Sequence, residues 1–146
     1  MKHILIVISL FFALNQTLLA EANVGFQRSY ETSTLTDGTV VYLDPDTFAS
    51  FPGGTAEMHK FITQNLRWPE EYLKIGGVRV TVYLRATIKE NGEIATIIIV
   101  QSVDELFDKE AIRIVRLMPD FIPAKARGEN VASYFIIPVR FRYKAR

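Results

Sequence analysis

Alternating apolar and polar side chains single out residues 78–100 as the stretch around which this chain is organised. In residues 78–88 every second side chain is apolar, and those between are Arg, Thr or Tyr. A period of two predicts a strand with one buried and one solvent-facing side. Asn91-Gly92 separates this run from a second β-prone run and favours a hairpin with a type I′ turn. Because a two-stranded hairpin is only marginally stable alone, other segments must cover its apolar side.

The second arm of this hairpin, residues 94–100, is apolar on both sides. Ile94, Thr96, Ile98 and Val100 share one face, and Ala95, Ile97 and Ile99 share the other. The pattern therefore leaves open which face joins the core. The surplus face is either covered by another segment, such as residues 39–43, or is a contact surface.

Two helices are predicted, one on each side of the hairpin. The first follows the chain-breaking Phe51-Pro52-Gly53-Gly54, has Thr55 as its expected cap, and ends at Trp68-Pro69, where a short further turn begins. Its apolar face consists of Met58, Phe61, Ile62 and Leu66. The second begins with a capping box, Ser102-x-x-Glu105, and ends before Pro119. Its apolar face consists of Phe107, Ala111, Ile114, Val115 and Met118.

A third strand is predicted at residues 134–143, after a loop at 121–130. Its apolar side chains again alternate, and Pro138 lacks the N–H group that a central strand needs, so the strand is expected at an edge or a bulge. The element order is helix, strand, strand, helix, strand. This order predicts an α+β fold in which two helices pack on one face of a small, three-stranded antiparallel sheet.

The chain divides into three regions. Residues 1–22 combine a positive start, an apolar run at 4–14 and a small-x-small site at Ala20-Glu21-Ala22, the layout of a secretory signal peptide. The alternative is an uncleaved anchor in the inner membrane, although a spanning helix needs about 20 apolar residues. Residues 23–50 are expected to be a linker with one short accessory strand near 39–43. Residues 51–146 form the globular domain.

Composition excludes several kinds of chemistry. With no cysteine there can be neither a disulfide nor thiolate chemistry. The only histidine after the leader, His59, has no partner at metal-ligand spacing, so neither a metal nor a cofactor is expected. No nucleophile–base pair or phosphate loop is present, which argues against an enzyme, and no aromatic strand signature points to nucleic acid. The residues from 109 onward are basic and those from 21 to 108 acidic, which indicates either two solvated faces or a basic binding edge.

An ordered series of short motifs over residues 51–143 resembles the TonB C-terminal domain family. The motifs are Phe51-Pro52-Gly53-Gly54, Trp68-Pro69, Gly77-Val78-Arg79-Val80, Asn91-Gly92, Ser102-Val103-Asp104, Asp108-Lys109-Glu110-Ala111, Met118-Pro119-Asp120-Phe121-Ile122-Pro123-Ala124-Lys125, Gly128 and Ile137-Pro138-Val139-Arg140-Phe141. The chain departs from the usual family residues at Trp68, Tyr72, Gly76 and Phe121. The linker is also short, reaching at most about 95 Å when fully extended, which argues against the role of a full-length transducer working from the inner membrane.

The resemblance implies a periplasmic domain that binds the TonB box of outer-membrane transporters and supports energy-dependent nutrient uptake. In such domains the last strand captures an extended peptide by strand addition. The residues that this implies here are Tyr134, Phe135, Ile136, Ile137, Pro138, Val139, Arg140, Phe141, Arg142 and Tyr143, with Arg140 and Arg142 facing acidic partner side chains. Inner-membrane proton-driven motor proteins would be further partners if the N-terminus is retained. The alternative is a periplasmic scaffold module that forms a homodimer through its edge strand without transducing energy.

Overall fold

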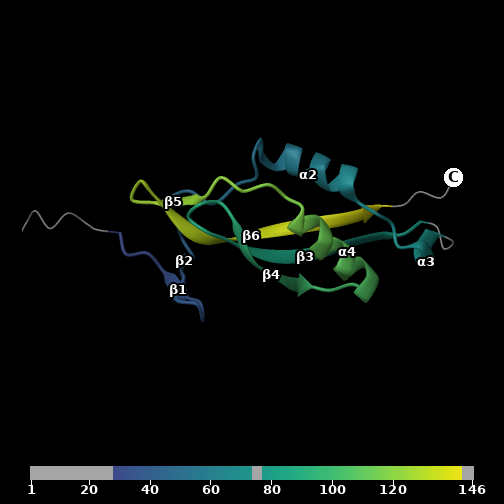
Figure 1. Ribbon diagram of the computed structural model, residues 1–146, viewed down its shortest axis with the longest axis horizontal. Coiled ribbons are helices and arrows are strands. Elements are labelled where there is room, and N and C mark those ends of the chain that lie inside the picture. The colour runs from purple at the N-terminus through teal and green to yellow at the C-terminus, as the bar shows by residue number, and fades with distance from the viewer. Residues whose placement is uncertain (1–27, 74–76, 143–146) are drawn as a thin grey trace, which may run out of the picture.

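The computed structural model describes residues 28–73 and 77–142. The expected signal segment 1–22, Gly76 and Tyr143 lie outside the described residues. The elements in chain order are β1 (Thr32–Thr34), β2 (Val40–Tyr42), α2 (Gly54–Asn65), α3 (Glu70–Leu73), β3 (Arg79–Ile88), β4 (Ile94–Gln101), α4 (Glu105–Arg116), β5 (Ala124–Ala126) and β6 (Glu129–Arg142). Figure 1 shows a long, curled sheet with α2 beside β6 and α4 beside β3 and β4.

The sheet is larger than the sequence predicted, and it is mixed rather than antiparallel. Its order is β1-β2-β6-β3-β4, and β5 pairs with the start of β6. The antiparallel β4–β3–β6 unit agrees with the prediction, but β2 adds to β6 in parallel through Val41↔Ala132 and Tyr42↔Ser133. The expected accessory strand at 39–43 is confirmed as β2. Strands β1 and β5 fall in segments predicted to be loop, because three-residue strands carry no readable period.

The hairpin between β3 and β4 is confirmed, but its predicted turn type is wrong. Gly92 donates its N–H to the Lys89 carbonyl and has a φ of 92°, whereas Asn91 does not adopt positive φ. This is the pattern of a three-residue loop with a glycine bulge. Positive φ at two successive residues, as a type I′ turn requires, occurs instead at Arg127 and Gly128 between β5 and β6.

Both helix caps also differ from the prediction. The residue before α2 is Gly53, in a left-handed conformation, and no side chain caps this helix, so Thr55 does not act as the cap. In α4 the cap is Asp104, whose carboxylate accepts the N–H of Leu106. Ser102 instead bonds the side chain of Asp108, so the predicted Ser102–Glu105 capping box does not form.

The core lies between the sheet and helices α2 and α4. Its largest fully buried side chains are Phe107, Phe141, Leu84, Ile88, Ile114 and Ile137. Phe107 is the centre of an aromatic cluster with Phe141 at 4.8 Å, Tyr72 at 4.6 Å and Trp68 at 6.0 Å between ring centroids. Two of the departures from the usual family residues, Trp68 and Tyr72, therefore pack together on the same core ring.

Candidate partner-binding edge

The last strand, β6, changes its surroundings along its length. Its first part is enclosed, because residues 129–131 pair with β5 and residues 132–133 pair with β2. Residues 134–142 pair with β3 on one side, and within the described part of the chain no strand pairs with their other side. From Pro138, the sequence predicted that residues 134–143 form an edge strand or contain a bulge, and the β3–β6 register shows no bulge at Pro138. The structure confirms an edge for residues 134–142, whereas residues 129–133, which the sequence pattern did not place in the strand, extend β6 into the interior of the sheet.

The side chains of this part of β6 alternate between two environments. Phe135, Ile137, Val139 and Phe141 pack against the core on the side of the helices. Tyr134, Ile136, Pro138, Arg140 and Arg142 lie on the opposite side of the sheet, which we call the outer face. Ile136 remains 49% exposed there. The strand is therefore fixed by one face and available to solvent through the other face and the edge.

Pro138 indicates which backbone groups point to the unpaired edge. The β3–β6 register runs past Tyr83↔Pro138 without a shift. In an antiparallel pair, alternate residues bond the partner strand and the residues between them point away. A proline fits such a ladder where its missing N–H would point away from the partner. Beyond the end of the β2 pairing, the outward-pointing set is therefore Ile136, Pro138, Arg140 and Arg142, with three N–H donors and a gap at Pro138.

A hollow of about 440 Å³ lies beside this edge, between α2 and the end of β6. Its lining consists of His59, Ile62, Thr63, Leu66, Trp68, Arg140 and Arg142. The sequence placed Ile62 and Leu66 on the core face of the first helix. It gave no signal that this helix stands next to the open edge, because that depends on how α2 packs against β6.

A charged contact from α4 holds the chain on either side of Leu66, one of the residues that line the hollow. The Glu110 carboxylate accepts the backbone N–H of Arg67 at 2.7 Å and two bonds from the Arg113 guanidinium, which also donates to the Asn65 carbonyl. Burial by itself would raise the pKa of Glu110, but the bonds from Arg113 and Arg67 outweigh it and leave the pKa below its ordinary value. The segment that carries Leu66 is thus tied to α4 at ordinary pH.

The outer face of the sheet is basic. Arg79 and Arg85 on β3 and Arg140 and Arg142 on β6 lie on this side, and no Asp or Glu occurs in β3, in β4 or in residues 134–142. The Arg85 guanidinium lies over the Tyr134 ring, 4.4 Å from its centroid. Within the described ranges, Arg79, Arg140 and Arg142 form no ion pair. The sequence anticipated Arg140 and Arg142 but not the two arginines beside them.

The other edge of the sheet, β4, is less suited to receive a strand. Its register with β3 shifts twice, so that Ala95 and Val100 are left without partners as bulges. Bulges twist an edge and interrupt its row of backbone groups, a common protection against strand addition. Compared with β4, the C-terminal part of β6 keeps a regular row of groups.

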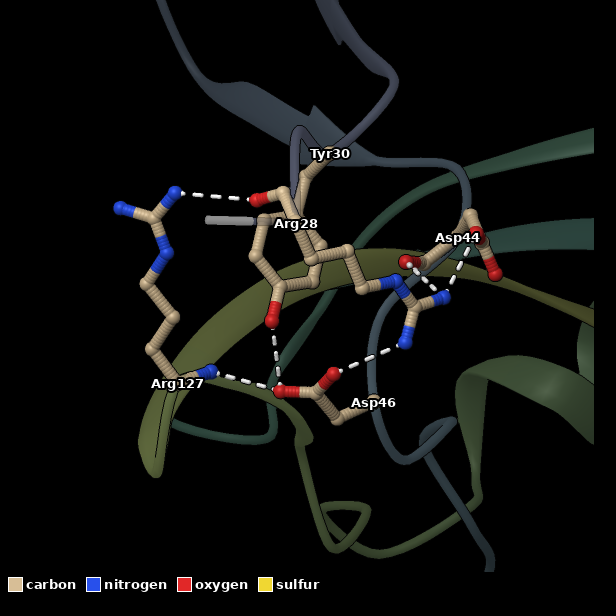
Figure 2. A network of polar contacts seen from close by, with 5 residues as sticks. All are labelled: Arg28, Tyr30, Asp44, Asp46 and Arg127. Carbon is tan, nitrogen blue, oxygen red and sulfur yellow. Dashed lines mark hydrogen bonds and ion pairs between the residues drawn. The ribbon is translucent and has the colours of Figure 1, made fainter. Parts of the chain in front are cut away.

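A polar cluster joins the N-terminal hairpin to the β5–β6 turn (Figure 2). The Asp46 carboxylate accepts bonds from the Tyr30 hydroxyl, the Arg28 guanidinium and the Arg127 backbone N–H, and Arg28 also pairs with Asp44. The Tyr30 hydroxyl first, and then the Arg127 N–H, hold the pKa of Asp46 below its ordinary value. The cluster fastens β1 and β2 to the domain. The sequence did not reveal it, because its members are far apart along the chain.

The described residues show no group of three or more His, Cys, Asp or Glu that could hold a metal ion. His59 lies in α2 at the rim of the hollow. No helix within residues 28–73 or 77–142 is long and apolar enough to cross a membrane.

Comparison with known proteins gives one family. The family described as "Gram-negative bacterial TonB protein C-terminal" matches residues 65–143, from the end of α2 through β6. A comparison with curated proteins finds no match. Domains of this family act in TonB-dependent transport as non-enzymatic energy-transducing or protein-interaction domains, and its proteins are associated with the cell envelope. The family match covers more than half of the chain, which therefore belongs to the TonB C-terminal domain family.

Proposed function

We propose that this protein works in the periplasm, where it binds the TonB-box segment of outer-membrane transporters by adding it as a strand to residues 134–142. The observation that carries the proposal is the unpaired edge of β6, which lies beside a hollow. The edge strand β4, by contrast, is interrupted by two bulges. An extended segment bonds such an edge through its main chain, while pockets beside the edge read its side chains. Binding of this kind supports energy-dependent nutrient uptake, with the protein as the periplasmic receptor of the transporter segment.

The backbone of the edge provides the test. Ile136→Pro removes one outward N–H, whereas Ile136→Ala removes the same exposed side chain and keeps the N–H. We would titrate both variants and the unmodified protein with a TonB-box peptide and follow backbone amide shifts by NMR. The expected result is that shifts concentrate in residues 134–142, that they persist in Ile136→Ala, and that binding is lost or at least tenfold weaker in Ile136→Pro.

The scaffold alternative gives a different result in the same experiment. If the edge pairs with a second copy, sedimentation will show a stable dimer whose amides in residues 134–142 are protected without peptide. Millimolar peptide would then leave these amides unchanged. That outcome would refute peptide capture.

A further inference from the structure

The N-terminal hairpin β1–β2 lies at one end of the open β6 edge. Ser133 pairs with Ile88 of β3 on one side and with Tyr42 of β2 on the other, so β2 lies on the side of β6 from which a partner would approach. We propose that this hairpin is an end stop, which fixes the register in which a partner segment adds to residues 134–142. The inference rests on the strand addition proposed above and specifies where the added strand is placed. The hairpin precedes the residues that match the family, so this role belongs to a segment that the family match does not cover.

Backbone directions show that β2 uses the same row of β6 groups that the partner would use. The N–H of Leu43 donates to the Glu31 carbonyl beside β1. Because successive residues of a strand direct their N–H groups to opposite sides, the N–H and carbonyl of Tyr42 point to β6. They meet the outward row of β6 beside Ser133, immediately before the open position at Ile136. A partner segment added to this edge therefore lies in line with β2 and cannot extend past it.

An end stop is needed because strand pairing by itself permits slips of two residues. A slip by one residue turns every side chain of the added strand to the other face, but a slip by two keeps each side chain on its face. It also keeps the direction of every backbone group. The missing N–H of Pro138 does not prevent it, because one partner carbonyl lies opposite Pro138 in either register. A slip toward β2 is blocked by the hairpin, and a slip away from β2 leaves the backbone groups of Ile136 unpaired.

The contacts of the hairpin resist its displacement by a partner. Val41 of β2 is fully buried, and Ala132, with which it pairs, is 3% exposed. The Asp46 carboxylate accepts the Tyr30 hydroxyl at 2.7 Å and the Arg127 backbone N–H at 2.7 Å, which ties both the start and the end of the hairpin to the turn before β6. A partner that displaced β2 would expose Val41 and strain these bonds. It therefore takes the part of the edge that β2 leaves open.

Spin-labelled peptides measure the register. One TonB-box peptide would carry a nitroxide on a cysteine added at its first position, and a second peptide would carry it at its last position. The protein has no cysteine, so the label stays on the peptide. In NMR spectra of the complex, each label broadens most strongly the amides nearest to it. We expect one label to broaden amides next to Ser133 and the other to broaden amides next to Arg142, each in a single register.

Two variants at one position test the stop itself. Tyr42→Pro removes the N–H that β2 directs to β6, whereas Tyr42→Ala removes the same ring and keeps the N–H. In Tyr42→Pro we expect the amide shifts caused by the peptide to extend to Ala132 and Ser133. The broadening from the label nearest to β2 should spread by two residues, about 7 Å along the strand. In Tyr42→Ala the register should stay as it is in the unmodified protein.

The outcomes separate the end stop from the proposed function. If the peptide shifts residues 134–142 but each label broadens positions two residues apart in the unmodified protein, strand addition stands and the end stop is overturned. An unchanged register in Tyr42→Pro also overturns it. Loss of binding in that variant does the same, because the hairpin would then support the partner rather than limit it. If the unmodified protein shows no shifts in residues 134–142, the proposed function falls and the end stop falls with it.

Discussion

Replacing Gly92 by alanine should destabilise the domain through one close contact between backbones. Gly92 sits in the turn between β3 and β4 with a φ of 92°, and its carbonyl accepts the N–H of Phe121 at 2.8 Å. A Cβ atom built on Gly92 would lie 2.2 Å from the Phe121 carbonyl oxygen. That oxygen belongs to the backbone and cannot rotate away, so the two segments must move apart.

The magnitude follows from separate contributions. Holding alanine at positive φ destabilises the folded state by about 1–2 kcal/mol. Alanine also lowers the conformational entropy of the unfolded chain, which offsets about 0.4–1 kcal/mol of this loss. Separating the segments leaves the buried Phe121–Gly92 hydrogen bond weakened, at about 1–3 kcal/mol. It also disturbs Phe121, which is 4% exposed and packs on Phe51 and Phe135. We expect Gly92→Ala to lower the free energy of unfolding by about 3–4 kcal/mol.

Gly128 offers a matched control. It has a φ of 80° in the turn between β5 and β6, but a Cβ atom there would meet nothing within 4 Å. Gly128→Ala should therefore cost only the conformational strain, about 1 kcal/mol. Both variants would be unfolded in urea with fluorescence and circular dichroism as parallel probes. Equal losses of stability in Gly92→Ala and Gly128→Ala would refute the role of the Phe121 contact.

Two further predictions concern the core and the N-terminal hairpin. Phe107→Ala should lower the free energy of unfolding in urea by about 3–5 kcal/mol because the ring is 1% exposed and contacts Tyr72 and Phe141; a loss below about 1 kcal/mol would contradict the packing. The bonds to Asp46 form with its ionised carboxylate, and its pKa is lowered, so they should be complete above the ordinary aspartate pKa and be lost as pH falls through the lowered value. The NMR shift of the Arg127 amide should report that titration and become insensitive to pH in Asp46→Asn; a midpoint at or above the ordinary value would count against the network.

Local patterns in the sequence determined the elements of the β3–β4–α4–β6 unit. These patterns involve only residues that are close together in the sequence. They are the alternation in residues 78–88 and 134–143, the helical spacing of Phe107, Ala111 and Ile114, and the breaks at Pro69 and Pro119. Such patterns predict helices and strands without a structure, because burial of one face requires apolar side chains at the spacing of that face. The motifs that resemble the TonB C-terminal domain rest on the same local signals, and the family match confirms them over residues 65–143.

Tertiary structure decided what depends on distant partners. The short strands β1, β2 and β5 form because other segments pair with them, and their own sequences do not predict those partners. Val41 of β2, for example, pairs with Ala132 of β6. The ambiguity of β4 was resolved by a bulge at Ala95, which brings Ile94 onto the same core side as Ile97 and Ile99. The candidate site is of this kind too. Pro138 indicated an edge, but only the folded sheet shows how far that edge extends. The pairing of β2 with β6 stops at Ser133, and α2 forms a hollow beside the rest of β6. An edge or a hollow forms where one segment ends before it covers its neighbour in the folded protein. The local sequence pattern cannot predict this, because it depends on segments that are distant along the chain.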